Sequence, residues 1–366
     1  MTNGMSFWNQ GLRGGVKMSL AVLCGLMLAL PASAGVPSDQ GGFKVLPAIT
    51  RGNLAVFPVV ANHLYDTSQL LTLDEGVRSG QVTVTEAGNE RGLIRPGQTI
   101  PRREEGAEVN RLVLYNNSSR PLLLLAGEIV TGGKQDRVIG SDRIVPPNTG
   151  PIDLGVFCVE PGRWVASSAN FGSMGAQMAQ PSVRTPAMAE HYQNRVWDNV
   201  RASNAKVAKS LSGSEAESVG GTSSYAKVFA SAPVAKLVST YGGTESEQAI
   251  LRELRAKGAV GVVVAVNGRV LWADVFASTE LLSKYWPKLM RSYVAEAMTS
   301  ANNGAAADIH EAELYMNVLT GGREIVETEP EVYRRTDITG DGYRVFELTA
   351  LLPKTGFNVH ITKIRQ

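Results

Sequence analysis

The apolar residues of this chain change their spacing near residue 165, and this change limits the possible folds more than any other feature of the sequence. Before it, short apolar segments separated by turn residues predict strands. These segments are 54–60, 82–86, 111–115, 121–126, 137–139 and 152–159. After residue 188, apolar side chains recur at steps of four and seven, as on one face of a helix. The sequence therefore predicts an α+β fold, with a β-rich region at 35–165 and an α+β region at 188–366.

Two turn sequences predict antiparallel hairpins in the β-rich region. Residues 116–119, Asn-Asn-Ser-Ser, join two apolar segments, and a Thr-Gly-Gly turn at 131–133 joins 128–130 to the segment that follows. Short connections of this kind favour pairing between consecutive strands. Residues 166–187 are rich in Ser, Ala, Met and Gln and follow neither period, which predicts a surface segment between the two regions.

The C-terminal region combines signals for helices and strands. Asn267-Gly268 lies between two apolar runs and predicts a tight hairpin, because this dipeptide readily adopts positive φ angles. Thr244 and Glu247 fit a capping box at the start of a helix, and Pro287 lies within a later helical pattern, which it is expected to kink or split. Helices are predicted on the stripes 188–211, 250–254 and 282–293, a linker at 212–224, and strands near 343–348 and 357–364.

The first 34 residues have the organisation of a secretory signal peptide. Arg13 and Lys17 precede the apolar run 18–30, which is followed by Pro31 and the small-residue triplet 32–34. A membrane-spanning helix needs about 20 apolar residues, more than this run supplies. We therefore predict cleavage before Gly35, export to the periplasm or the medium, and no stable membrane anchor in the mature protein.

Cysteine usage excludes an intramolecular disulfide in the mature protein. Cys24 leaves with the signal peptide, so Cys158 is the one cysteine that remains. Apolar residues alternate around Cys158, which predicts a buried position in a strand. The alternative is a nucleophilic thiolate, which would need a neighbouring cation such as Arg163.

Charge and histidine spacing exclude several classes of function. The chain has 36 Lys and Arg against 34 Asp and Glu, and removal of Arg13 and Lys17 with the signal peptide leaves a net charge of zero. A neutral chain has no general attraction for phosphate backbones, so we do not expect nucleic acid as a partner. The four histidines show no metal-binding spacing, and the sequence predicts neither a metal site nor a cofactor.

The segment 127–143 has the strongest chemical signal. Adjacent glycines at 132 and 133 would let backbone amides approach a ligand, and nearby cations could bind an anion. Glu128 or Asp136 could transfer a proton as a catalytic acid or base. The alternative is a hairpin whose charges pair across the strands or are solvated. The predicted ligand-binding residues are Gly132, Gly133, Lys134, Gln135, Arg137, Arg143, Glu160, Arg163 and Trp164.

Three blocks of sequence resemble a known family. They are 121–137 (PLLLLAGEIVTGGKQDR), 157–164 (FCVEPGRW) and 193–200 (QNRVWDNV). Together they are similar to the ARG and rhodanese-phosphatase-superfamily-associated protein domain, a domain of unknown function. The resemblance runs from about residue 43 through 294, and it makes 35–366 as one family domain an alternative to two regions. It implies a link to nucleotide-derived or phosphorylated ligands.

Two functional hypotheses follow from these observations. In the first, the exported protein is a binding module whose hairpin recognises a small anionic ligand or a protein partner. In the second, it is a hydrolase or transferase acting on a nucleotide-derived or phosphorylated small molecule, with Lys134, Arg137 and Arg143 stabilising the anion. The binding module is favoured, because no ordered set of acid, base and nucleophile can be assembled from the sequence.

Overall fold

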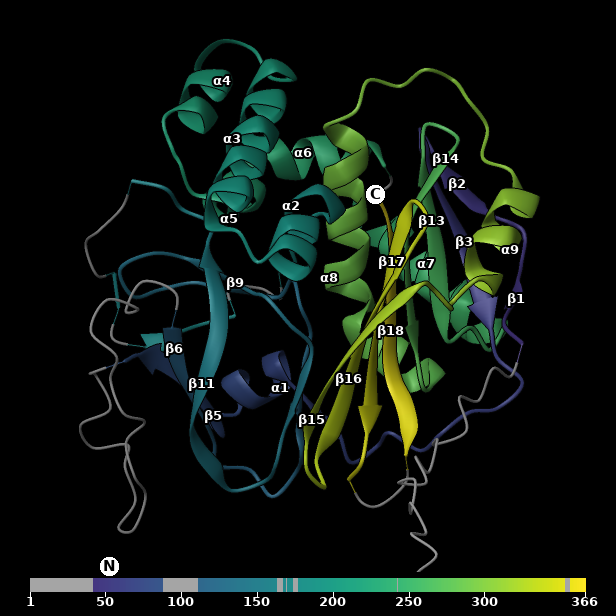
Figure 1. The fold of residues 1–366 in the computed structure, drawn as a ribbon. Helices are drawn as coiled ribbons and strands as arrows, with labels where there is room; N and C mark the ends of the chain where they lie inside the picture. The colour runs from purple at the N-terminus through teal and green to yellow at the C-terminus, as the bar shows by residue number, and fades with distance from the viewer. Residues whose placement is uncertain are drawn as a thin grey trace, which may run out of the picture. The chain divides into compact units, whose positions relative to one another are not determined.

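An antiparallel sheet of nine strands is the largest element of the fold (Figure 1). The computed structural model describes residues 42–87, 111–162, 167–168, 170–173, 177–241, 243–352 and 356–366, which lie within one compact unit, residues 39–366. The order of the strands is β1 (Lys44–Val45), β3 (Leu54–Val60), β13 (Gly261–Val266), β14 (Arg269–Phe276), β18 (Phe357–Arg365), β17 (Tyr343–Ala350), β16 (Tyr333–Gly340) and β15 (Arg323–Glu329), with β2 (Ile49–Arg51) beside β3. The first and last parts of the described chain therefore meet in one sheet.

Two smaller sheets come from the N-terminal half. The six-stranded sheet has the order β12 (Asn170–Phe171), β5 (Val82–Glu86), β6 (Arg111–Asn116), β11 (Thr149–Cys158), β9 (Arg137–Ile139) and β8 (Ile129–Val130). The three-stranded sheet has the order β10 (Arg143–Val145), β7 (Leu122–Leu124) and β4 (Leu71–Thr72). β8 and β9 form the antiparallel hairpin predicted over 131–133. The β-rich first half and the α+β class are thus confirmed.

The prediction of a hairpin over 116–119 is wrong. β6 pairs with β5 and β11, whereas β7 pairs with β4 and β10 in another sheet. The buried side-chain amide of Asn116 donates to the carbonyl oxygens of Arg120, Val145 and Pro146 at 2.9, 3.3 and 2.9 Å. Its carbonyl oxygen accepts from the hydroxyl of Ser118 at 2.7 Å. These bonds hold a turn that carries the chain from one sheet to the next.

Helices cover both faces of the large sheet. Along β13, Val262 and Val264 pack in the cluster that contains α8, whereas Val263 packs in the cluster that contains α9. This alternation follows from the two-residue period of a strand. The helices are α1 (Leu73–Arg78), α2 (Pro181–Thr185), the π-helix η2 (Pro186–Glu190), α3 (Gln193–Lys209), α4 (Gly213–Gly220), α5 (Tyr225–Ala230), α6 (Ala232–Thr240), α7 (Gly243–Ala256), α8 (Thr279–Met298) and α9 (Ile309–Asn317).

The hairpin at Asn267-Gly268 is confirmed. The two residues have φ angles of 55° and 78° and connect β13 to β14. β17 and β18 likewise lie where strands were predicted. α8 continues through Pro287 without a break. No helix of the described ranges is long and apolar enough to cross a membrane.

Several predictions for the middle of the chain are wrong. Where 166–187 is described, its second part is interior: Gln180 and Arg184 are buried, and α2 begins at Pro181. The predicted linker 212–224 contains α4. The helix expected from 188 begins at Gln193, because His191 takes the left-handed conformation and ends the preceding helix. Helix α7 begins at Gly243, which places Thr244 inside the first turn and not at the cap.

Candidate functional site

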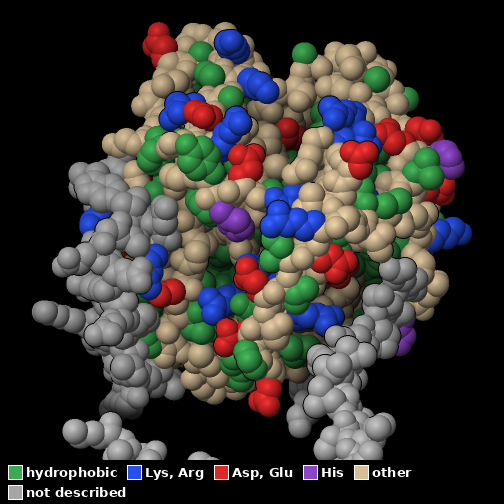
Figure 2. Space-filling view, viewed as in Figure 1, with side chains coloured by type: hydrophobic (Ala, Val, Ile, Leu, Met, Phe, Trp, Pro, Cys, Tyr) green, Lys and Arg blue, Asp and Glu red, His purple; other side chains and the backbone are tan. Residues whose placement is uncertain are grey.

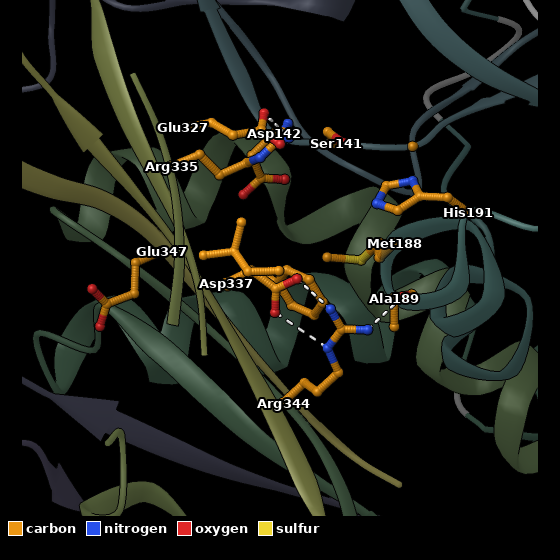
Figure 3. Close-up of a pocket in the computed structure, with 13 residues that line it drawn as sticks. Ser141, Asp142, Met188, Ala189, His191, Glu327, Arg335, Asp337, Arg344 and Glu347 are labelled. Atoms are coloured by element: carbon orange, nitrogen blue, oxygen red, sulfur yellow. Dashed lines mark hydrogen bonds and ion pairs between the residues drawn. The ribbon is translucent and has the colours of Figure 1, made fainter. Parts of the chain in front are cut away.

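A pocket of about 270 Å³ lies between strands β15–β17, the loop 140–142 and the π-helix η2 (Figure 3). Its volume is near the lower end of the range for small-molecule sites, about 300–1,000 Å³. The lining residues are Gly140, Ser141, Asp142, Met188, Ala189, His191, Ile325, Glu327, Arg335, Asp337, Arg344, Phe346 and Glu347. The site thus combines charged and apolar side chains from three separate parts of the chain.

The strands place the charged side chains of the pocket on one face. Glu327 lies opposite Arg335, and Ile325 lies opposite Asp337, so these four side chains share a face of the sheet. Arg335 forms an ion pair with Glu327. Arg344 binds the carboxylate of Asp337 through two nitrogens and also donates to the carbonyl oxygen of Ala189. Arg344 therefore connects the sheet to the π-helix.

The π-helix η2 forms the opposite wall. Pro186, its first residue, has no N–H to donate to the carbonyl four residues earlier, which interrupts the α-helical bonding of α2. π-helical turns occur frequently at functional sites. His191 ends the element with a φ of 50°, a left-handed conformation that is uncommon outside glycine and is often found at functional positions. Partial burial, together with the charges of Arg335 and Arg344, lowers the pKa of His191, so its ring is neutral at pH 7.

Asp142 connects the pocket to a buried ionic network. One carboxylate oxygen accepts from the backbone N–H of Ala126 at 2.7 Å, and the other lies 2.6 Å from Nδ1 of His360. The other ring nitrogen of His360 lies 3.2 Å from a carboxylate oxygen of Asp274. His360 and Asp274 are completely buried. The histidine therefore lies between two carboxylates, one of which faces the pocket.

Asp274 is the centre of this network. The guanidinium of Arg184 donates to both of its oxygens, at 3.1 and 3.2 Å, and Nε1 of Trp272 donates at 2.8 Å. Burial opposes ionisation of Asp274, but the charge of Arg184 and the bonds to His360 hold its pKa well below the usual range.

The same interactions fix the protonation of His360. Burial acts to lower the pKa of His360, but the two carboxylates outweigh it and raise the pKa to about 9. The network therefore contains two carboxylates, an imidazolium and a guanidinium, with no net charge. Because Arg184 lies on α2 directly before η2, the network joins the two walls of the pocket.

Residues 42–361 match the family model of the ARG and Rhodanese-Phosphatase-superfamily-associated Protein domain. The chain belongs to this family. The resemblance seen in the sequence is confirmed, and the matched range of the family domain contains every residue of the pocket. No curated protein and no solved structure matches the chain significantly.

The two residues predicted as acid or base lie in the interior of the family domain. Glu128, which is 1% exposed, binds Nζ of Lys288 at 2.6 Å, and the same ammonium group binds Asp74. Burial raises the pKa of Glu128, and the charge of Asp74 adds to this effect, whereas the charge of Lys288 opposes it. The carboxylate of Asp136 accepts from the N–H of Gly132 at 3.2 Å and from the hydroxyl of Ser224 at 2.9 Å. Neither carboxylate lines the pocket.

The predicted ligand-binding residues mostly bind other parts of the protein. A side chain at Gly133 would lie 2.4 Å from the ring of Phe171, so close packing requires this glycine. The other contacts run from Lys134 N to Glu86 (2.7 Å), from Gln135 Nε2 to the carbonyl of Glu160 (3.0 Å), from Arg137 to Gln135 Oε1 (3.4 Å), from Asp136 N to the carboxylate of Glu160 (3.2 Å) and from Arg143 to the carbonyl of Asp153 (2.9 Å).

The predicted segment reaches the pocket only at its end. Residues 140–142 line the pocket, while Arg163 and Trp164 lie outside the described residues. A ligand-binding role for 127–143 therefore stays a prediction. Cys158 is buried in β11, as predicted, and burial raises the pKa of its thiol.

Sequence reasoning missed most of the pocket. Arg335 and Asp337 are two residues apart in one strand, which is a signal that their side chains share a face. His360 interrupts an apolar strand pattern at 357–364, which is a signal of a buried polar group. In the described ranges, no group of three or more His, Cys, Asp or Glu side chains is placed to hold a metal ion.

Proposed function

We propose that this family member is an exported binding module, and that its pocket on β15–β17 holds the anionic group of a small ligand. The observation that carries the proposal is the ion pair of Arg335. Its partner, Glu327, has a side chain that is 63% exposed. An ion pair with such an exposed partner contributes at most about 1 kcal/mol. A ligand carboxylate or phosphate can therefore replace Glu327 at low cost.

The remaining charges of the pocket are matched within the protein. Asp142 faces the imidazolium of His360, and Arg344 holds Asp337. Glu347 points away from the other labelled side chains in Figure 3. On the face of the molecule seen in Figure 2, acidic and basic side chains are interspersed and form no field of one sign. Recognition thus depends on Arg335 itself, whose planar guanidinium suits bidentate binding of carboxylate or phosphate.

One observation favours the enzyme as a second candidate. Each oxygen of Asp142 accepts one hydrogen bond, which leaves acceptor capacity for a ligand, and Ser141 lines the pocket beside it. A hydrolase or transferase acting on a phosphorylated small molecule could use Asp142 as a base. Release of phosphate or alcohol from bound phosphate esters, lost in Asp142→Asn, would identify this activity.

A thermal-shift comparison tests the binding proposal. Inorganic phosphate, sugar phosphates, nucleotides and small dicarboxylates are each added to the wild type, Arg335→Ala and Glu327→Gln. We expect at least one compound to raise the melting temperature of the wild type. Arg335→Ala should abolish that rise while changing the melting temperature of the free protein little. Glu327→Gln should enlarge it, because the competing carboxylate is gone.

The matched control is Arg252→Ala, which removes an exposed arginine on α7, away from the pocket. It should keep the full response. The proposal fails if no anionic compound stabilises the wild type, or if Arg335→Ala responds as the wild type does.

A further inference from the structure

Strand β15 is the last strand of the large sheet and has an open edge. It pairs with β16 over all seven residues, and among the described residues its other edge pairs with no strand (Figure 1). All seven residues are exposed, including Ile325 at 43% and Val326 at 53%. Proteins usually protect an edge strand by making it short or by placing charged side chains (especially lysine), proline or a bulge in it. β15 is seven residues long and has no lysine, proline or bulge, and its charged residues are Arg323, Glu324, Glu327 and Glu329.

The sequence of β15, Arg-Glu-Ile-Val-Glu-Thr-Glu, is complementary to itself in one antiparallel register. When Val326 lies opposite Val326 of a second copy, Arg323 lies opposite Glu329 at both ends. Glu324 then faces Thr328, and no two like charges are opposite. Opposite charges directly across a strand pair are favourable, whereas like charges are not.

Neighbouring registers lack this complementarity. When Val326 lies opposite Ile325, two pairs of glutamates, 324 with 327, face each other. When Val326 lies opposite Glu327, glutamates 324 and 329 face each other in two pairs. The register centred on Val326 is therefore the one that pairs all seven residues without repulsion, and its two-fold symmetry is that of a closed homodimer.

We propose that a second copy of this chain pairs with β15 edge to edge, so that the large sheets of two copies become continuous. In this arrangement Glu327 of the second copy faces Ile325. Residues directly opposite in an antiparallel pair point to the same face. Because Ile325 lines the pocket, each copy places a carboxylate at the rim of its neighbour's pocket. The dimer does not depend on which ligand the pocket holds.

A charge exchange tests the proposal in the full chain. The mass in solution is measured by light scattering over a range of concentrations for the wild type, Arg323→Glu, Glu329→Arg and the double exchange. We expect a dimer for the wild type, at least a tenfold weaker dimer for each single variant, and recovery in the double variant. The cross-strand neighbours of these residues in β16, Thr339 and Tyr333, are uncharged, so the monomer should fold normally.

A cysteine cross-link tests the register independently. In a Cys24→Ser background, Val326→Cys should form a disulfide-linked dimer under mild oxidation, because paired Cα atoms lie about 4.5–5.5 Å apart. Thr328→Cys should not form this cross-link, because residue 328 of one copy lies opposite residue 324 of the other, four residues away from the second cysteine. A wild type that stays monomeric with no cross-link at 326, or equal cross-linking at both positions, would overturn the proposal.

Discussion

At the scale of single residues, His360 has the clearest pH-dependent role. Its pKa is about 9 in the folded protein, whereas an unfolded histidine titrates near about 6.5. The folded state therefore binds this proton more tightly. Its contribution to stability is complete below about pH 6.5 and is lost as the pH rises through about 9.

We expect the stability advantage of wild type over His360→Gln to shrink by on the order of 3 kcal/mol between pH 6.5 and 9.5. The measurement is denaturant unfolding of both proteins across this range. His310→Gln, which changes an exposed histidine, should follow the wild type at every pH. A constant difference between wild type and His360→Gln would contradict a charged His360.

Asp142 and the buried network behind the pocket show why a site of this kind is hard to predict. Asp142, His360, Asp274 and Arg184 come from a loop, β18, β14 and α2, and no two of them share a local motif. Their pairing depends on the order of the strands. The charges of segment 127–143 are close in sequence, which predicts a shared site, yet most of them bind neighbouring segments of the fold.

At the scale of elements, α8 is joined to the β-rich half by Lys288. This buried side chain binds Glu128 and Asp74, which lie before β8 and in α1. Lys288→Met would leave two buried carboxylates without their cation. We expect a loss of on the order of 3–5 kcal/mol in the free energy of unfolding, measured by denaturant titration.

Glu128→Gln should lower the free energy of unfolding clearly less than Lys288→Met, because Lys288 keeps Asp74 as a partner. Lys284→Met, one turn earlier on α8, removes partly exposed ion pairs with Glu75 and Glu280 and should cost about 1 kcal/mol or less. Equal losses for Lys284→Met and Lys288→Met would show that α8 is not anchored by this triad.

The elements that sequence predicts well are those whose signal is local. The hairpin at Asn267-Gly268 needs only the two residues that form its turn. The prediction for the turn at Asn116 is wrong because the hydrogen-bond partners of Asn116 include Val145 and Pro146, about 30 residues further on. The sequence does not predict β15 and β16, because these two strands are rich in charged residues and lack an apolar alternation.

At the scale of the whole molecule, the proposal of export rests on residues 1–34. Mass spectrometry of the protein purified from its native host should find Gly35 as the first residue. The control is a variant with Arg13 and Lys17 changed to Glu, which should remain uncleaved and inside the cell. An intact Met1 in the wild-type protein would contradict export by this route.

The position of β18 has a consequence for the order in which this protein can be made. β18 is the last strand in sequence, yet it lies between β14 and β17 and carries His360. A growing chain therefore cannot close its largest sheet, or pair His360 with Asp142, until β18 has been synthesised. Loss of residues 357–366 would therefore remove an inner strand of the sheet together with His360.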